Sequence, residues 1–197
     1  FVFAPTPEEM YTPEEMQQPF SFDFNGLDTV MEGKMRPGHF NGVVQVVSRL
    51  FELVRPTRAY FGEKDFQQLA IIRHMVDQSS LAGQFEGLKI IGCPIVREKS
   101  GLAMSSRNER LSENEKQIAV GISKTLISSV EWAKNTSVED VKQRVIDTIN
   151  AIDGLEVEYY EIVDKTTLQP TNTFQNAIGC VTVYCGPVRL IDNIQYQ

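Results

Sequence analysis

The segment 60–69, with the sequence YFGEKDFQQL, contains the first residues that could carry chemistry. Gly62 would let the backbone approach a ligand closely, and Lys64 is a mobile positive charge suited to a phosphate. Asp65 could accept a hydrogen bond from a ribose hydroxyl, or it could serve only as the N-cap of a following helix. The charged triplet that begins at Glu63 is also compatible with an ordinary solvated turn.

A second candidate is the segment 97–111, REKSGLAMSSRNERL. Its two adjacent serines and the following arginine supply hydroxyls, backbone N–H donors and a bidentate guanidinium, a combination suited to phosphate oxygens. The segment follows an apolar strand candidate, so we expect it at the same sheet edge as Lys64. The alternative is a polar linker that only caps the next helix.

A third segment, 36–43, reads RPGHFNGV. Pro37 and Gly38 predict a rigid turn into a helix that begins near His39. A lone histidine in this position is more often structural than catalytic.

The segments around these candidate residues alternate between strand and helix. Apolar residues at helical spacing predict a helix over 43–54, and a short buried strand is expected at 59–61. Asp65 and Gln68 could form a capping box for the next helix. A second apolar strand is predicted over 88–96. Two apolar strands that flank a helix are typical of a parallel α/β sheet.

The first 24 residues are less regular. FVFAP resembles the end of a strand already under way, which suggests a fragment of a longer chain. The two TPEEM copies predict a loop with a helical turn, and SFDF at 21–24 alternates like a short strand.

After Asn108 the pattern changes. Ser112 with Glu115, and Ser137 further on, predict the N-caps of two long amphipathic helices. Three strand candidates with partial alternation then follow, at 155–163, 176–185 and 188–194. We therefore expect one domain over residues 1–110 and a second, α+β domain with an antiparallel sheet over 111–197.

Composition narrows the function classes. Of the 197 residues, 42% are hydrophobic and 23% charged, and the net charge is −7 without a basic cluster. Binding to nucleic acid or to an anionic membrane is therefore not expected, and no apolar run is long enough to span a bilayer. The cysteines Cys93, Cys180 and Cys185 indicate buried thiols in a reducing cytoplasm. Two histidines are too few for a multi-histidine metal site.

Together, RPGHFNGV, YFGEKDFQQL and GLAMSSRN resemble the pantoate–β-alanine ligase family, as do FVFAP and RLIDN. The resemblance runs over essentially the whole chain. It implies an α/β fold: part of a nucleotidyltransferase-type Rossmann domain, followed by a small α+β lid domain. It also implies a homodimer, formed through the Rossmann part.

The implied reaction is ATP-dependent. The pantoate carboxylate attacks the α-phosphorus of ATP, which yields pantoyl adenylate and pyrophosphate, and the amine of β-alanine then displaces AMP. Mg²⁺ is expected with the phosphates, without a metal cluster supplied by the protein.

The resemblance also assigns residues. Lys64 is the implied catalytic group, Asp65 would hold the ribose, and Gln68 would bind pantoate. The implied ATP-binding residues are Gly62, Glu63, Lys64, Asp65, Val96, Met104, Ser105, Ser106 and Arg107.

One departure affects the expected activity. The family carries an HxGH motif whose histidines stabilise charge on the phosphates, and this chain has no HxGH. We therefore expect the isolated chain to be inactive. A non-catalytic nucleotide-binding or assembly module is the main alternative. A nucleotidyltransferase with another acceptor is a further one, although the glutamine pair and RPGHF favour pantoate.

Overall fold

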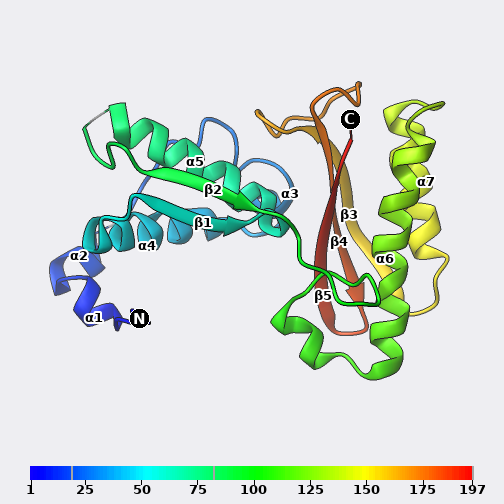
Figure 1. The fold of residues 1–197 in the computed structure, drawn as a ribbon, viewed down its shortest axis with the longest axis horizontal. Coiled ribbons are helices and arrows are strands. Elements are labelled where there is room, and N and C mark those ends of the chain that lie inside the picture. Colours follow the sequence, from blue (N-terminus) through cyan, green and yellow to red (C-terminus); the bar gives the residue numbers. More distant parts are fainter. Residues whose placement is uncertain (19, 82, 197) are drawn as a thin grey trace.

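Two separate sheets organise the chain (Figure 1). The computed structural model describes residues 1–18, 20–81 and 83–196. In chain order its elements are α1 (Pro7–Met10), α2 (Pro13–Gln17), α3 (Met31–Met35), α4 (His39–Val54), β1 (Arg58–Gly62), the 3-10 turn η1 (Glu63–Asp65), α5 (Phe66–Leu81), β2 (Lys89–Cys93), the 3-10 turn η2 (Ser106–Arg110), α6 (Glu113–Trp132), α7 (Val138–Asn150), β3 (Leu155–Asp164), β4 (Ala177–Cys185) and β5 (Val188–Gln195).

The first sheet is the predicted strand, helix, strand unit. β1 and β2 are parallel, with Gly62 opposite Cys93 at their carboxyl ends. The connecting helix α5 buries Leu69, Ile72 and Met75 as its spacing predicts. α4 and α5 pack against each other, and Val44 of α4 and Ile71 of α5 belong to one buried cluster.

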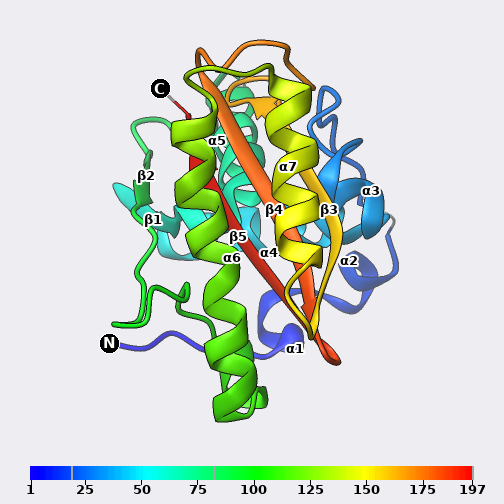
Figure 2. The same ribbon diagram turned by 90° about the vertical axis from the view of Figure 1, so that its right-hand side faces the viewer.

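The second sheet is antiparallel, in the order β3-β4-β5. Helices α6 and α7 cover one face of it (Figure 2). The other face packs on the first half of the chain, because Ile178 and Cys180 of β4 join the cluster that contains Val44 and Ile71. β4 is therefore buried on both faces, which explains why its sequence alternates so weakly. The predicted α/β fold with a C-terminal antiparallel sheet is confirmed.

Local signals correctly predicted the starts of α4, α6 and α7, whereas α3 was not predicted. The hydroxyl of Ser112 accepts from the N–H of Glu115 at 3.3 Å, and the Ser137 hydroxyl accepts from the N–H of Asp140 at 3.1 Å. Gly38 has a φ of 80°, a left-handed conformation that suits glycine, and α4 begins at His39.

The strand predicted over 21–24 is wrong. Residues 21–24 form no ladder within the described part of the chain. The carboxylate of Asp23 instead accepts from the N–H of Asn25 at 2.9 Å, a local turn that competes with strand pairing. Phe24 is buried and its ring meets that of Phe22 edge-on at 5.0 Å.

The second expected capping box is also absent. α5 follows the 3-10 turn η1 without a break, and among the described residues no hydrogen bond joins Asp65 to Gln68. Because α5 continues from η1, its start needs no separate cap. Both side chains therefore stay available for a ligand.

Candidate active site

One cavity lies between the two halves of the fold. It is lined by residues of α3, α4, η1 and α5, by Arg107 of η2, and by residues of the antiparallel sheet. Of the predicted site residues, it brings together Lys64, Asp65, Gln68 and Arg107.

The carboxyl end of β1 positions Lys64. After Gly62 the chain turns through η1, so Lys64 and Asp65 lie at the sheet edge where ligands of open α/β sheets bind. A Cβ atom on Gly62 would meet nothing within 4 Å, so the space beside its backbone is open. This arrangement agrees with the expectation that the 62–65 segment faces a ligand.

The charge of Lys64 has no ion-pair partner among the described residues. Burial lowers the pKa of its ammonium group. Asp65 and Asp192 act in the opposite sense, whereas Arg107 lowers the pKa further. A half-buried ammonium group without a salt bridge favours the binding of an anion.

Arg107 reaches the cavity from η2. The hydroxyl of Ser105 accepts from the Arg107 N–H at 3.3 Å, and Arg107 Nη1 donates to the main-chain oxygen of Arg189 at 3.1 Å. Ser105 lines a smaller cavity that also contains Lys64. The guanidinium and the ammonium groups therefore approach the same region from different segments.

The remaining predicted residues lie outside the main cavity, and Val96 and Met104 line neither cavity. The N–H of Met104 donates to the main-chain oxygen of Val96 at 2.9 Å, which brings these two exposed residues together. Gly62, Glu63 and Ser106 line neither cavity. Glu63 instead folds over β2, where its Oε1 would lie 2.9 Å from a Cβ atom on Gly92.

The two glutamines of α5 have different environments. Gln68 lines the cavity and makes no side-chain hydrogen bond among the described residues. Gln67 is 5% exposed, and its Nε2 donates to the main-chain oxygens of Leu27 at 2.7 Å and Val30 at 2.9 Å. Both glutamines line the cavity, but only Gln67 also holds the loop that precedes α3, through its Nε2.

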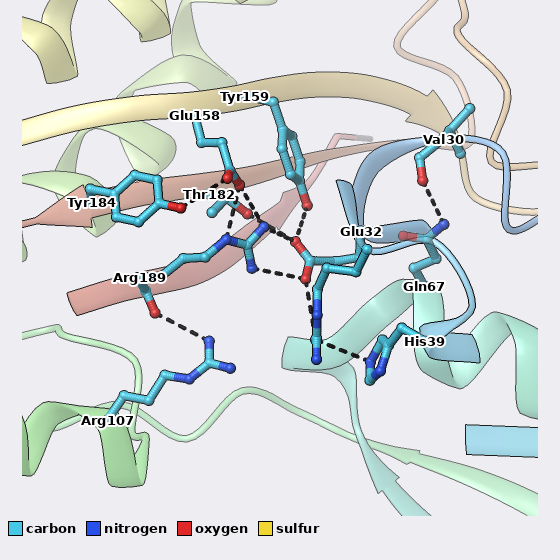
Figure 3. Close-up of polar contacts among 11 residues, drawn as sticks. Val30, Glu32, His39, Gln67, Arg107, Glu158, Tyr159, Thr182, Tyr184 and Arg189 are labelled. Atoms are coloured by element: carbon cyan, nitrogen blue, oxygen red, sulfur yellow. Dashed lines mark hydrogen bonds and ion pairs between the residues drawn. The ribbon is translucent and has the colours of Figure 1, made fainter. Parts of the chain in front are cut away.

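Sequence reasoning assigned no site role to a polar cluster at the cavity wall (Figure 3). Glu32 accepts from Arg189 Nη1 at 2.9 Å and Nη2 at 2.6 Å, and from the hydroxyl of Tyr159 at 2.9 Å. Arg36 Nη1 lies 3.1 Å from His39 Nε2. Burial, followed by the neighbouring Arg36, lowers the pKa of His39.

Two motifs of the sequence could have pointed to these residues. RPGHF contains Arg36 and His39, and RLIDN contains Arg189, Asp192 and Asn193. Glu32 and Tyr159 had no local signal, because their contact joins positions 127 residues apart.

Comparison with known proteins identifies the family. The sequence model of pantoate–β-alanine ligase matches residues 1–195. The chain belongs to the pantoate–β-alanine ligase family. A ligase from Phocaeicola vulgatus is 57% identical over 200 residues, which cover all of this chain and 68% of that relative. A ligase from Bacteroides fragilis is 55% identical with the same coverage.

Solved ligase structures agree with the fold. The Thermus thermophilus ligase superposes with a TM-score of 0.87 at 38% identity, over 99% of this chain and 69% of the other. The Francisella tularensis ligase, in complex with β-γ ATP and β-alanine, has a TM-score of 0.63 at 32% identity. The superposition covers 86% of this chain and 55% of the F. tularensis ligase.

The implied activity is thereby supported. Ligation of pantoate to β-alanine is the activity of this family, and the chain spans about two thirds of the length of the relatives. None of the helices in the described residues combines the length and the hydropathy that a membrane crossing requires.

Proposed function

We propose that the cavity between the two sheets forms pantoyl adenylate from ATP and pantoate. The observation that supports this proposal is the convergence of Lys64 and Gln68 from one segment, and of Arg107 from another, on one cavity. The cations of Lys64 and Arg107 match the charged phosphates of ATP, and the amide of Gln68 matches the polar groups of pantoate. The reaction must bring these two substrates together.

ATP would lie along the 62–65 segment and the η2 turn. Lys64 and Arg107 neutralise phosphate charge, and the hydroxyls of Ser105 and Ser106 hydrogen-bond phosphate oxygens as the loop adapts. Asp65 accepts from the ribose. Val96 and Met104, which are joined at the exposed rim, meet the adenine ring.

Pantoate would be held by the amide of Gln68. Its carboxylate oxygen forms a bond to the α-phosphorus while the bond to pyrophosphate breaks, so negative charge passes to the leaving group beside Lys64. β-Alanine then attacks the acyl carbon through its amine, and AMP leaves with the bonding electrons. The F. tularensis complex with β-alanine supports this second acceptor.

Mg²⁺ fits this site only as a companion of the phosphates. The described residues contain no group of three or more candidate metal ligands. Mg²⁺ commonly keeps several waters and binds substrate phosphates with few protein ligands, and it supplies further charge neutralisation when bound. Asp65 is the carboxylate of η1 that lines the cavity, and it would supply one such contact.

Three further expectations remain proposals. The resemblance supports a homodimer, and the free cysteines support a cytoplasmic location. The division into residues 1–110 and 111–197 is supported by the two separate sheets, one in each part.

Pantoate-dependent exchange of labelled pyrophosphate into ATP tests the function directly. In a polypeptide that also supplies the HxGH segment, we expect exchange only with pantoate present, and a loss in Lys64→Ala but not in Lys134→Ala, whose ammonium group pairs with Glu131 on the surface. The 197-residue chain alone should show negligible exchange, because it has no HxGH. Binding of ATP without any exchange by the polypeptide that carries HxGH would instead support the non-catalytic module.

A further inference from the structure

The motif RLIDN, residues 189–193, has no role in the adenylation scheme above. It forms the middle of β5, in the antiparallel sheet. Three of its side chains, those of Arg189, Asp192 and Asn193, leave the sheet and contact segments from the first half of the chain.

Asn193 contacts the lysine segment. Its Nδ2 donates to the main-chain oxygens of Glu63 at 2.8 Å and Lys64 at 3.0 Å, and the residue is 5% exposed. Both partners are carbonyl acceptors, so only the NH2 group of the amide can face them. The two contacts therefore hold the η1 turn by the backbone at the residue that carries the ammonium group.

Asp192 contacts the next segment. Its carboxylate forms a bidentate pair with Arg97, at 2.7 and 3.0 Å. Arg97 also donates to the main-chain oxygen of Gly101 at 3.2 Å, and it is bridged to Ala103 in the backbone. This pair fixes the base of the loop that leads to Ser105 and η2.

Arg189 completes the set. Its guanidinium pairs with Glu32 of α3 and Glu158 of β3, and its main-chain oxygen accepts from Arg107. One strand thus holds two of the cationic residues of the cavity, Lys64 through its backbone and Arg107 through its side chain.

We propose that Arg189, Asp192 and Asn193 are positioning residues that assemble the adenylation site from three segments of the first half of the chain. The proposal rests on the function proposed above. Phosphate-neutralising groups are effective only when they are held at the developing charge, and loss of a supporting contact loosens them. The site is then complete only while β5 is docked against η1 and the Arg97 loop.

Asn193→Asp tests the strand at its contact with Lys64. The variant keeps the size of the side chain, but it loses both donors and places a carboxylate against two carbonyl oxygens. We expect the rate of pyrophosphate exchange at saturating substrate to fall at least about 30-fold, with the dissociation constant of ATP within about 3-fold.

Asn176→Asp is the matched control. Asn176 lies just before β4, is exposed, and also donates through Nδ2 to two oxygens, those of Asp164 and Thr166. We expect its exchange rate to match that of the unmodified enzyme.

A double-mutant cycle separates positioning from general damage. If Asn193 acts through Lys64, the exchange rate of the double variant Lys64→Ala/Asn193→Asp should be no more than about 3-fold below that of Lys64→Ala alone. Multiplied losses would overturn the proposal, as would exchange by Asn193→Asp at the rate of Asn176→Asp. All of these variants are made in the polypeptide that also supplies the HxGH segment, and absence of exchange in its unmodified form would count against the proposed function instead.

Hydrogen exchange of the unmodified protein covers the case in which Asn193→Asp does not fold. Docked segments that open together have the same free energy of opening. We expect the protected amides of β5, of residues 63–66 and of residues 103–108 to exchange with a common opening free energy. Earlier, independent exchange of 63–66 while β5 stays protected would contradict the proposal.

Discussion

Arg189 and Glu32 are 157 residues apart in the sequence, yet the guanidinium donates to both oxygens of the carboxylate, at 2.9 and 2.6 Å. The side chains are only 18% and 15% exposed. This pair joins the antiparallel sheet to α3 at the wall of the cavity. Because Glu158 pairs with the same guanidinium, one cation serves two carboxylates.

Removal of Arg189 should therefore destabilise the fold strongly. Arg189→Met leaves two buried carboxylates without their shared cation, and we expect a loss of about 3–5 kcal/mol in the free energy of unfolding. Denaturant unfolding monitored by circular dichroism measures it. Lys134→Met, which breaks an exposed pair, should cost less than about 1 kcal/mol. Equal losses in the two variants would contradict this assignment.

Glu32 should also make stability pH-dependent. Burial alone raises the pKa of Glu32, but hydrogen bonds from Arg189 and Tyr159 outweigh it, and the net pKa is lowered from 4.5. A carboxyl group with a depressed pKa stabilises the fold above its unfolded pKa, and this contribution is lost as pH falls through the folded pKa. We expect Glu32→Gln to be less stable than the unmodified protein at neutral pH. Its melting temperature should then fall less than that of the unmodified protein as the pH is lowered. Melting temperatures measured from about pH 7 to about pH 3 check this, and parallel curves for the two proteins would refute it.

Lys64→Ala should slow adenylate formation far more than it weakens ATP binding. One preorganised electrostatic contact contributes about 2–4 kcal/mol to transition-state stabilisation. Single-turnover rates and ATP titrations separate the two effects, and unchanged turnover at saturating ATP would exclude the assigned role.

The charge of Lys64 should make the rate of adenylate formation depend on pH. Because burial lowers the pKa of Lys64, its cationic form is lost at a lower pH than for a free lysine. We expect the rate of adenylate formation to decline on the alkaline side below the ordinary lysine pKa of 10.5. In Lys64→Arg the residual activity should lack this decline, since the guanidinium stays charged. A pH–rate profile of both enzymes tests it.

The adjacent glutamines form a matched pair for mutation. Gln68→Ala should raise the KM for pantoate with little change in melting temperature, because Gln68 faces the cavity without a protein partner in the described residues. Gln67→Ala removes the donor to two main-chain oxygens, so it should lower stability by about 1–3 kcal/mol. Steady-state kinetics and thermal unfolding of both variants are the measurements. The reverse pattern would exchange the two roles.

Local features of the sequence were sufficient to predict most of the longer helices and strands and several candidate site residues. The capping serines Ser112 and Ser137 act within three residues of themselves, so their helices were predictable. The lysine segment was recognisable because its glycine and charges follow an apolar strand at short range. A family resemblance carried by contiguous motifs assigned Gln68 and Arg107, and both line the cavity.

Tertiary structure decided the contacts between distant positions. The bond from Asn193 to the oxygen of Lys64 spans 129 residues, and the pair of Arg97 with Asp192 spans 95. Residues 21–24 alternate like a strand, yet Asp23 forms a turn there. Side-chain periodicity reports only which face of an element is apolar, whereas these contacts depend on how the two sheets dock. The motif RLIDN was therefore visible in the sequence, but its place at the cavity depended on the packing of β5 against η1.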